Sequence, residues 1–331
     1  MARIELWNGD ICDLEVDVAL GTVKLRRFVA VKVLHRELSA LTGGQVTVAH
    51  VLSNLRSAMA DMSQLSRWHL VDDIDAFERQ LRASSDKKLR VQVAELGLPA
   101  NTQIETLVGT PYIELINAVQ SQGFDLVVSG TRGQAGWKRF LVGSTSDRLL
   151  RNCPCPVWVV KGGQGQPPRS ILVPVDFSDC SLEAVEYAAF MAQRHQATLS
   201  LVHVLEPVSY GLDFTLLHSG KREELRERLA ARMTGLTTAL GAVNIKADSH
   251  IRGGVPADSI LDSARTIPAD LIVMGTHGRR GLSHLLCGSV AEAVLRQSRC
   301  PVLTVRSPKY APGHRRIVTG ATTEPTSSPG G

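Results

Sequence analysis

The fold is decided by one stretch of the sequence, Ala269-Asp-Leu-Ile-Val-Met-Gly-Thr-His-Gly278, in which an apolar run ends abruptly at glycine. Such a run, without polar alternation, is typical of a strand that is buried on both faces of a parallel sheet. The pattern also stands 145 residues earlier, as Phe124-Asp-Leu-Val-Val-Ser-Gly-Thr-Arg-Gly133. A repeat of this length predicts two copies of one domain.

Other residue pairs keep the spacing of 145, among them Gly109 with Gly254 and Pro156 with Pro301. A stretch rich in glycine and proline separates the two copies, and a stretch with few apolar residues follows the second. We therefore predict a first domain over 1–163, a linker over 164–168, a second domain over 169–306 and a disordered tail over 307–331.

The second copy alternates between short apolar runs and segments with helical spacing of apolar residues. The pattern predicts strands at 171–175, 199–205, 245–251, 271–274 and 302–305, and helices at 182–193, 225–240, 257–264 and 290–297. Such alternation predicts an α/β fold of two repeated doubly wound domains, each a mainly parallel five-stranded sheet with helices on both faces. We also expect the last strands, 156–160 and 301–305, to lie at the contact between the halves, because short apolar strands are unsuited to an exposed edge.

Composition narrows the class of protein. Of 331 residues, 44% are apolar and 21% charged, which is ordinary for globular domains. No apolar run approaches the ~18 residues of a membrane helix, and residues 1–10 lack a signal-peptide core. Six cysteines are too few for a disulfide scaffold, so a cytoplasmic location is expected. The net charge of +5, without a long basic block, predicts no nucleic-acid partner.

The chemistry of the chain concentrates in a glycine motif: Gly275-Thr-His-Gly278, nine residues, then Gly288-Ser289. Glycines let backbone N–H groups approach a phosphate, and a helix that begins at the serine would add its free N–H groups. The structural alternative is that Ser289 with Glu292, and Ser144 with Asp147, form capping boxes. We favour phosphate binding, because the motif recurs as Gly130-Thr-Arg-Gly133, nine residues, Gly143-Ser144.

These motifs, together with Val173-Pro-Val-Asp-Phe-Ser178, resemble the ATP-binding branch of the universal stress protein family, in two tandem domains over roughly 18–306. The resemblance implies that Asp176 meets the adenosine moiety and that Val204 offers backbone groups to adenine. It places Gly275, Gly278, Gly288, Ser289 and Val290 around the ribose and phosphates, and it suggests that Met274 touches the nucleotide. Pro174, Val175 and Arg279 complete the predicted second-half site. The corresponding, weaker set in the first half is Gly130, Gly133, Gly143, Ser144 and Thr145.

The first half departs from the family pattern at its beginning. Alignment of His50-Val51 with His203-Val204 places Val23 opposite Asp176, and no Pro-x-Asp-x-Ser is present there. Asp17 would be a substitute only after a change of register. A carboxylate accepts hydrogen bonds from sugar hydroxyls and valine does not, so we expect one tight site per chain, in residues 169–306.

The remaining polar residues suggest no catalytic group and no metal site. Cys153, Cys155 and Cys300 lack ligand partners at metal-site spacing and are interpreted as buried structural thiols. His50 and His203 are interpreted as packing residues with a backbone role. Arg132, Arg279 and Arg280 could equally be phosphate ligands or solvated loop residues.

The resemblance implies an ATP-binding module, with or without Mg²⁺, that acts in a stress response or in signalling. It also implies association of the two halves as a pseudo-dimer and allows a homodimer. Two alternatives remain open: a slow ATPase or nucleotide hydrolase, and a structural interaction protein that binds no nucleotide. Enzymatic activity is expected to be at most weak ATP hydrolysis, because no acid–base pair or activated nucleophile stands near the loops.

Overall fold

The computed structural model describes residues 14–17, 22–25, 46–52, 74–95, 102–130, 144–161, 167–206, 219–277 and 287–306. The chain divides into two compact units. One unit consists of the second half from Pro167 onward together with two segments of the first half, Asp125–Val128 and Cys155–Lys161. The other unit contains the rest of the first half.

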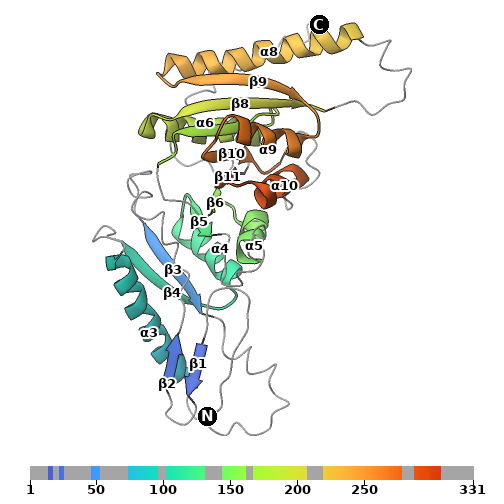
Figure 1. Cartoon of the computed structure of the whole chain (residues 1–331). Coiled ribbons are helices and arrows are strands. Elements are labelled where there is room, and N and C mark those ends of the chain that lie inside the picture. The colour runs from blue at the N-terminus through green and yellow to red at the C-terminus, as the bar shows by residue number, and fades with distance from the viewer. Residues whose placement is uncertain are drawn as a thin grey trace, which may run out of the picture. The chain divides into compact units, whose positions relative to one another are not determined.

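The second half forms a parallel sheet of five strands in the order β11-β10-β7-β8-β9 (Figure 1). The strands are β7 (Ser170–Pro174), β8 (Thr198–Leu205), β9 (Ala247–Gly253), β10 (Leu271–Gly275) and β11 (Val302–Val305). Ile171, Leu172 and Val173 of β7 are completely buried, as the continuous apolar run predicts for a central strand. The chain adds β8 and β9 on one side of β7 and then adds β10 and β11 on its other side, so the strand order switches between β7 and β10.

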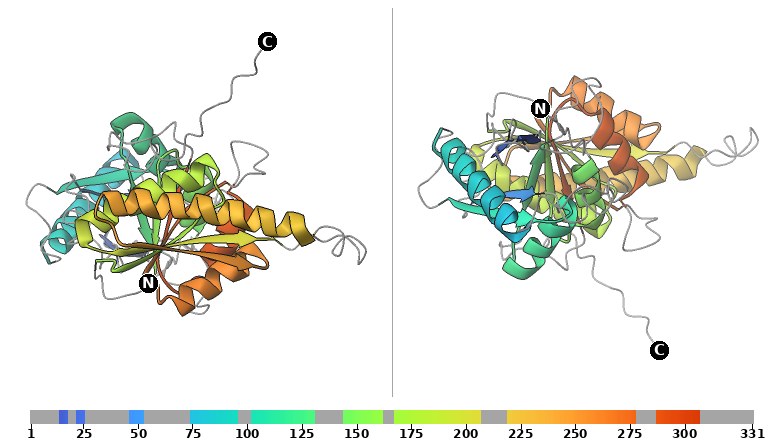
Figure 2. Two further views of the ribbon diagram at one scale, coloured as in Figure 1. Left: turned by 90° about the horizontal axis from the view of Figure 1, so that it is seen from above. Right: turned by 90° about the horizontal axis from the view of Figure 1, so that it is seen from below.

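Four helices connect these strands: α6 (Asp179–His195), α8 (Ser219–Ala242), α9 (Pro256–Thr266) and α10 (Ser289–Gln297). Figure 2 shows α6 and α8 on one face of the sheet and α9 and α10 on the other, as right-handed crossovers require for this strand order. The helices and strands predicted for the second half are confirmed, with ends that differ by a few residues. On α8 the apolar face is buried from Leu229 to Leu240, but Leu225 is half exposed.

Two strands of the first half extend this sheet beyond β11. Strand β6 (Val157–Val160) pairs antiparallel with β11, with Val159 opposite Val302, and β5 (Val127–Gly130) follows β6. The predicted contact between the two last strands is therefore confirmed. Directly after β6, the Lys161 amine donates hydrogen bonds to the carbonyls of Leu295 and Ser298 at the end of α10.

The other unit repeats part of the same architecture. Strands β3 (Thr47–Leu52) and β4 (Gln103–Val108) pair in parallel, and the Gly109 N–H then donates to the Leu52 carbonyl. In the second half the Gly254 N–H makes the equivalent bond to Leu205. The helices described in the first half are α3 (Ile74–Glu95), α4 (Pro111–Gln122) and α5 (Ser144–Asn152).

The beginning of the first half differs from that of the second. Strands β1 (Leu14–Asp17) and β2 (Thr22–Leu25) form an antiparallel pair in which Val16 lies opposite Val23. Among the described residues, no strand of the first half takes the place that β7 takes between β8 and β10. The mainly parallel α/β fold is confirmed, and the described residues show its complete five-stranded sheet in the second half.

Candidate functional site

The site predicted in the second half lies where the sheet changes its direction of strand addition. Asp176 comes two residues after the end of β7, Gly275 ends β10, and Val204 lies near the end of β8. The three strands are parallel, so these residues meet at one edge of the sheet. Ligands of open α/β sheets bind at the carboxyl ends of the strands, at such a switch point.

The Asp176 carboxylate is held by the turn that follows it. Its Oδ1 accepts hydrogen bonds from the Ser178 N–H at 3.0 Å and the Ser178 hydroxyl at 2.6 Å. Ser178 is also the N-cap of α6, and its Oγ lies 3.3 Å from the His277 carbonyl oxygen. The turn carrying Asp176 and the first half of the glycine motif therefore lie directly against each other.

His203 is a buried packing residue, and its side chain contacts the backbone of the site. Its ring is buried, and Nδ1 lies 2.6 Å from the carbonyl oxygen of Val175, one residue before Asp176. This contact fixes the end of β7 to β8. The equivalent His50 is also buried, and burial lowers the pKa of its imidazole to about 4.

Gly275 has to be glycine because the start of α6 passes next to it. A Cβ atom at this position would lie 2.8 Å from the Cys180 carbonyl carbon and 2.9 Å from its Cβ. Burial raises the pKa of the Cys180 thiol, and Asp176 and Asp179 raise it further. The thiol therefore remains protonated at neutral pH and is a poor nucleophile.

This close approach leads to a prediction for Gly275→Ala. We expect the substitution to lower the free energy of unfolding by about 1–3 kcal/mol, because main-chain atoms of a buried helix must move to admit the methyl group. Chemical denaturation followed by circular dichroism measures the change. The matched control is Gly130→Ala, at the equivalent first-half position, where no described atom lies within 4 Å of the new Cβ. Equal losses in the two variants would contradict this account.

Helix α10 begins at the second part of the glycine motif. Gly288 is its N-cap, and the Gly288 N–H donates to the Thr276 carbonyl at 2.8 Å. A Cβ on Gly288 would lie 2.9 Å from the Thr276 carbonyl oxygen, so glycine is required here too. The first N–H groups of the helix, those of Ser289, Val290 and Ala291, have no carbonyl partner within the helix and suit an anion.

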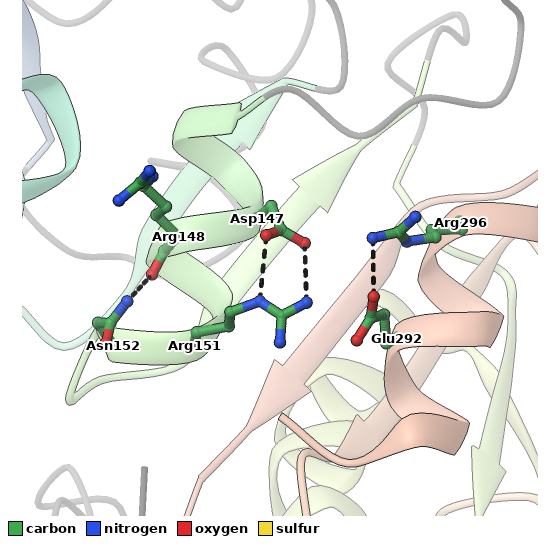
Figure 3. Close-up of polar contacts among 6 residues, drawn as sticks. All are labelled: Asp147, Arg148, Arg151, Asn152, Glu292 and Arg296. Atoms are coloured by element: carbon green, nitrogen blue, oxygen red, sulfur yellow. Dashed lines mark hydrogen bonds and ion pairs between the residues drawn. The ribbon is translucent and has the colours of Figure 1, made fainter. Parts of the chain in front are cut away.

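The capping-box alternative is wrong for Ser289. This serine is the first helical residue rather than the N-cap, and the Gly288 cap makes no side-chain hydrogen bond. Glu292 instead forms an ion pair of 2.7 Å with Arg296 (Figure 3). Figure 3 also shows the equivalent pair in the first half, where Arg151 Nε lies 3.1 Å from Asp147 Oδ2. The exposed Ser289 side chain is therefore not engaged as a helix cap.

The described first-half residues bring together less of the site. Ser144 and Thr145 open α5, and the Ser146 hydroxyl donates to the Gly130 carbonyl at 2.8 Å. Val23, aligned with Asp176, lies on the antiparallel strand β2, and Asp17 on β1 lies opposite Thr22 on β2. Among the described residues, the first half thus has no counterpart of the turn that carries Asp176.

Four other predicted residues lie on or next to the strands and the helix that border the site. Pro174 ends β7, Val175 donates its N–H to the Val202 carbonyl, Met274 is buried in β10, and Val290 is half buried at the start of α10. Gly133, Gly143, Gly278, Arg279 and the loop arginines Arg132 and Arg280 lie outside the described residues. Cys153 and Cys155 are buried, and Cys300 is partly buried.

Two residues of the site were missed by the sequence reasoning: Phe177 and Arg232. Phe177 follows Asp176 directly and has φ of 62°, and the Arg232 guanidinium on α8 lies 3.9 Å from the centroid of its ring. The neighbouring serine and aspartate pointed to this turn, but no spacing in the sequence connects Phe177 to a residue on α8.

Comparisons with known proteins agree with the repeat. The sequence model of the universal stress protein family matches residues 28–161 and 168–306. A universal stress protein of Mycobacterium tuberculosis is 28% identical over 276 residues, covering 81% of this chain and 89% of that protein. One from Methanocaldococcus jannaschii is 36% identical over 146 residues, covering 43% of this chain and 84% of that protein.

A solved structure has the same fold. The universal stress protein of Archaeoglobus fulgidus matches with a TM-score of 0.59 and 23% identity, covering 83% of this chain and 92% of that chain. Within the described part of this chain, no helix is long and apolar enough to cross a membrane.

Proposed function

The chain belongs to the universal stress protein family, and from this premise we propose that its second half binds ATP and acts as a nucleotide-dependent stress-response or signalling module. The observation that carries the proposal is the meeting of the Asp176 turn with the two glycines, Gly275 and Gly288, at the switch point of the sheet. Each glycine occupies a place where a side chain would not fit.

The residues at this edge fit the parts of the nucleotide. Asp176 can accept hydrogen bonds from the ribose hydroxyls, and the main chain near Val204 can pair with adenine. The phosphates would lie against the N-terminus of α10, where Ser289 adds a hydroxyl and the helix dipole favours negative charge. Gly278 and Arg279 belong to the same proposed site.

We propose that Mg²⁺, when present, arrives with the phosphates of ATP. Among the described residues, no three His, Cys, Asp or Glu side chains form a group that could hold a metal ion. We further propose a cytoplasmic location, a pseudo-dimer of the two halves with a homodimer as a further assembly, and no nucleic-acid partner.

The site fits a protein that signals by binding ATP better than one that hydrolyses ATP. His203 has its Nδ1 against the Val175 carbonyl oxygen, and burial keeps the Cys180 thiol protonated. Neither is arranged as a base or nucleophile toward the α10 N-terminus. Release of inorganic phosphate from ATP by purified protein measures any hydrolysis, and fast turnover would favour the hydrolase alternative.

The direct test of the proposed ligand is mass spectrometry of gently purified and then denatured protein. We expect ATP to be released in a ratio near one per chain. Calorimetry with added ATP tests the same point when purification removes the nucleotide. A protein that neither releases nor binds ATP would favour the structural interaction alternative.

Bound ATP is also expected to stabilise the folded protein. A ligand at 100 times its Kd contributes about 2.7 kcal/mol to the free energy of unfolding. For a domain near 150 residues this corresponds to a rise in Tm of roughly 5–10 °C. A thermal melt with and without millimolar Mg-ATP measures the shift, and Gly288→Val serves as the non-binding control. An equal shift in this variant would place the binding elsewhere.

A further inference from the structure

We propose that Arg232 on α8 is a positioning residue for the nucleotide site, because its stacking on Phe177 holds the turn that carries Asp176. The inference rests on the function proposed above and names a determinant of ligand binding at the same site. It connects a helix that carries none of the predicted ligand residues to the carboxylate expected to bind the ribose.

Phe177 has a backbone conformation that side chains rarely adopt. Its φ of 62° lies in the left-handed region, where a residue with a Cβ is disfavoured unless its surroundings hold it. Phe177 stands between Asp176 and Ser178, the two residues whose hydrogen bonds fix the carboxylate. A change of φ at Phe177 would therefore break the geometry that orients Asp176.

The surroundings hold this turn at two places. The Arg232 guanidinium carbon lies 3.9 Å from the centroid of the Phe177 ring, within the range of a cation–π contact. The His203 ring lies 5.5 Å from the same ring, tilted by 40°, and its Nδ1 holds the Val175 carbonyl. The turn is thus fixed to β8 by His203 and to α8 by Arg232.

The position of Arg232 on α8 is itself well determined. Leu229 and Met233, three residues before it and one after, are buried in the core and fix this part of the helix. Arg232 is exposed, as is Arg228 one turn earlier, but the stacking contact on Phe177 is made by Arg232. Arg228 therefore provides a control of the same residue type on the same helix.

The experiment compares Arg232→Met with Arg228→Met in two measurements. In ligand-free protein, hydrogen exchange read by mass spectrometry over residues 175–182 reports the turn directly, because the Ser178 N–H bonds to Asp176. Calorimetry then gives the affinities for ATP and adenosine. We expect Arg232→Met to speed exchange and to weaken the binding of both ligands by about two- to fivefold, as a cation–π contact at an exposed site predicts. Arg228→Met should leave both the exchange rate and the affinities unchanged. Arg232→Lys keeps a positive charge beside the ring and should cause a smaller change than Arg232→Met.

The alternatives give different results. If Arg232 contacted the ligand phosphates directly, ATP binding would weaken without faster exchange and adenosine would be unaffected, which overturns the proposal. In an Asp176→Asn background the effect of Arg232→Met on affinity should vanish, and a persistent loss also overturns it. If the wild type binds no nucleotide, the proposed function fails. Exchange then decides alone whether Arg232 holds the turn, and equal rates in the two methionine variants overturn that as well.

Discussion

Asp176→Ala is expected to weaken ATP binding by about ten- to hundredfold, the loss typical of a hydrogen bond to a charged group. The carboxylate lies at the switch point of the sheet, and its orientation is fixed by the Ser178 N–H and hydroxyl. Alanine removes both the acceptor for the ribose hydroxyls and the anchor of the turn. Calorimetry of the purified variant measures the loss. Asp176→Asn retains an oxygen for Ser178, so it separates the ligand contact from the fold of the turn.

The contrasting variant in the first half is Gly133→Val, in the glycine motif of that half. We expect it to change binding little, because the first half has Val23 where the second has Asp176, and Val23 lies on an antiparallel strand. The close approach of a helix to Gly275 is also missing around Gly130 among the described residues. A large loss in Gly133→Val together with normal binding in Asp176→Ala would place the working site in the first half.

The fold of the second half was predictable because its signals are local. Central strands of a parallel sheet are buried on both faces, so β7 and β10 stand out in the sequence as continuous apolar runs. The helices follow from apolar spacing, and the glycine motif marks where β10 ends. Leu225 shows where this reasoning fails. Its spacing fits the apolar face of α8, but it lies one turn before Leu229, where burial of that face begins.

The capping boxes illustrate a different limit. Ser289 with Glu292 has the residue types and spacing of such a box, but Gly288 occupies the cap position. Gly288 takes it because its N–H bonds to Thr276, a contact between two parts of the glycine motif. Glu292 is then one turn from Arg296 and pairs with it. Because this tertiary contact begins the helix one residue earlier than a capping box would, Ser289 is a candidate ligand rather than the helix cap.

Long-range contacts account for what the sequence could not predict. Phe177 and Arg232 are far apart in the chain and meet only when α8 packs beside the sheet. The beginning of the first half is a similar case. Alignment placed Val23 opposite Asp176, but nothing in the spacing indicated that β2 would pair antiparallel with β1. The contact between the two last strands was predictable, because short apolar strands are unsuited to an exposed edge, and the structure forms it by pairing β6 with β11.

Acidification should destabilise the first half through His50. Its side chain is 4% exposed on β3, and burial lowers its pKa from 6.5 to about 4. Between pH 6.5 and pH 4 the His50 imidazole is mostly protonated in the unfolded chain and mostly neutral in the folded chain. The free energy of unfolding therefore falls as the pH drops toward 4. The shift corresponds to a total loss of about 3 kcal/mol, of which about 2 kcal/mol appears between pH 7 and pH 5.

The measurement is chemical denaturation at a series of pH values for the wild type and for His50→Leu. Leucine is apolar and suits a buried strand position, and it removes the titrating group. Other groups titrate equally in both proteins, so the difference between their curves isolates His50. We expect the wild type to lose about 2 kcal/mol more than the variant between pH 7 and pH 5. His50→Gln is the second variant if leucine disturbs the fold. Parallel curves for wild type and variants would mean that the folded protein accepts the proton at His50.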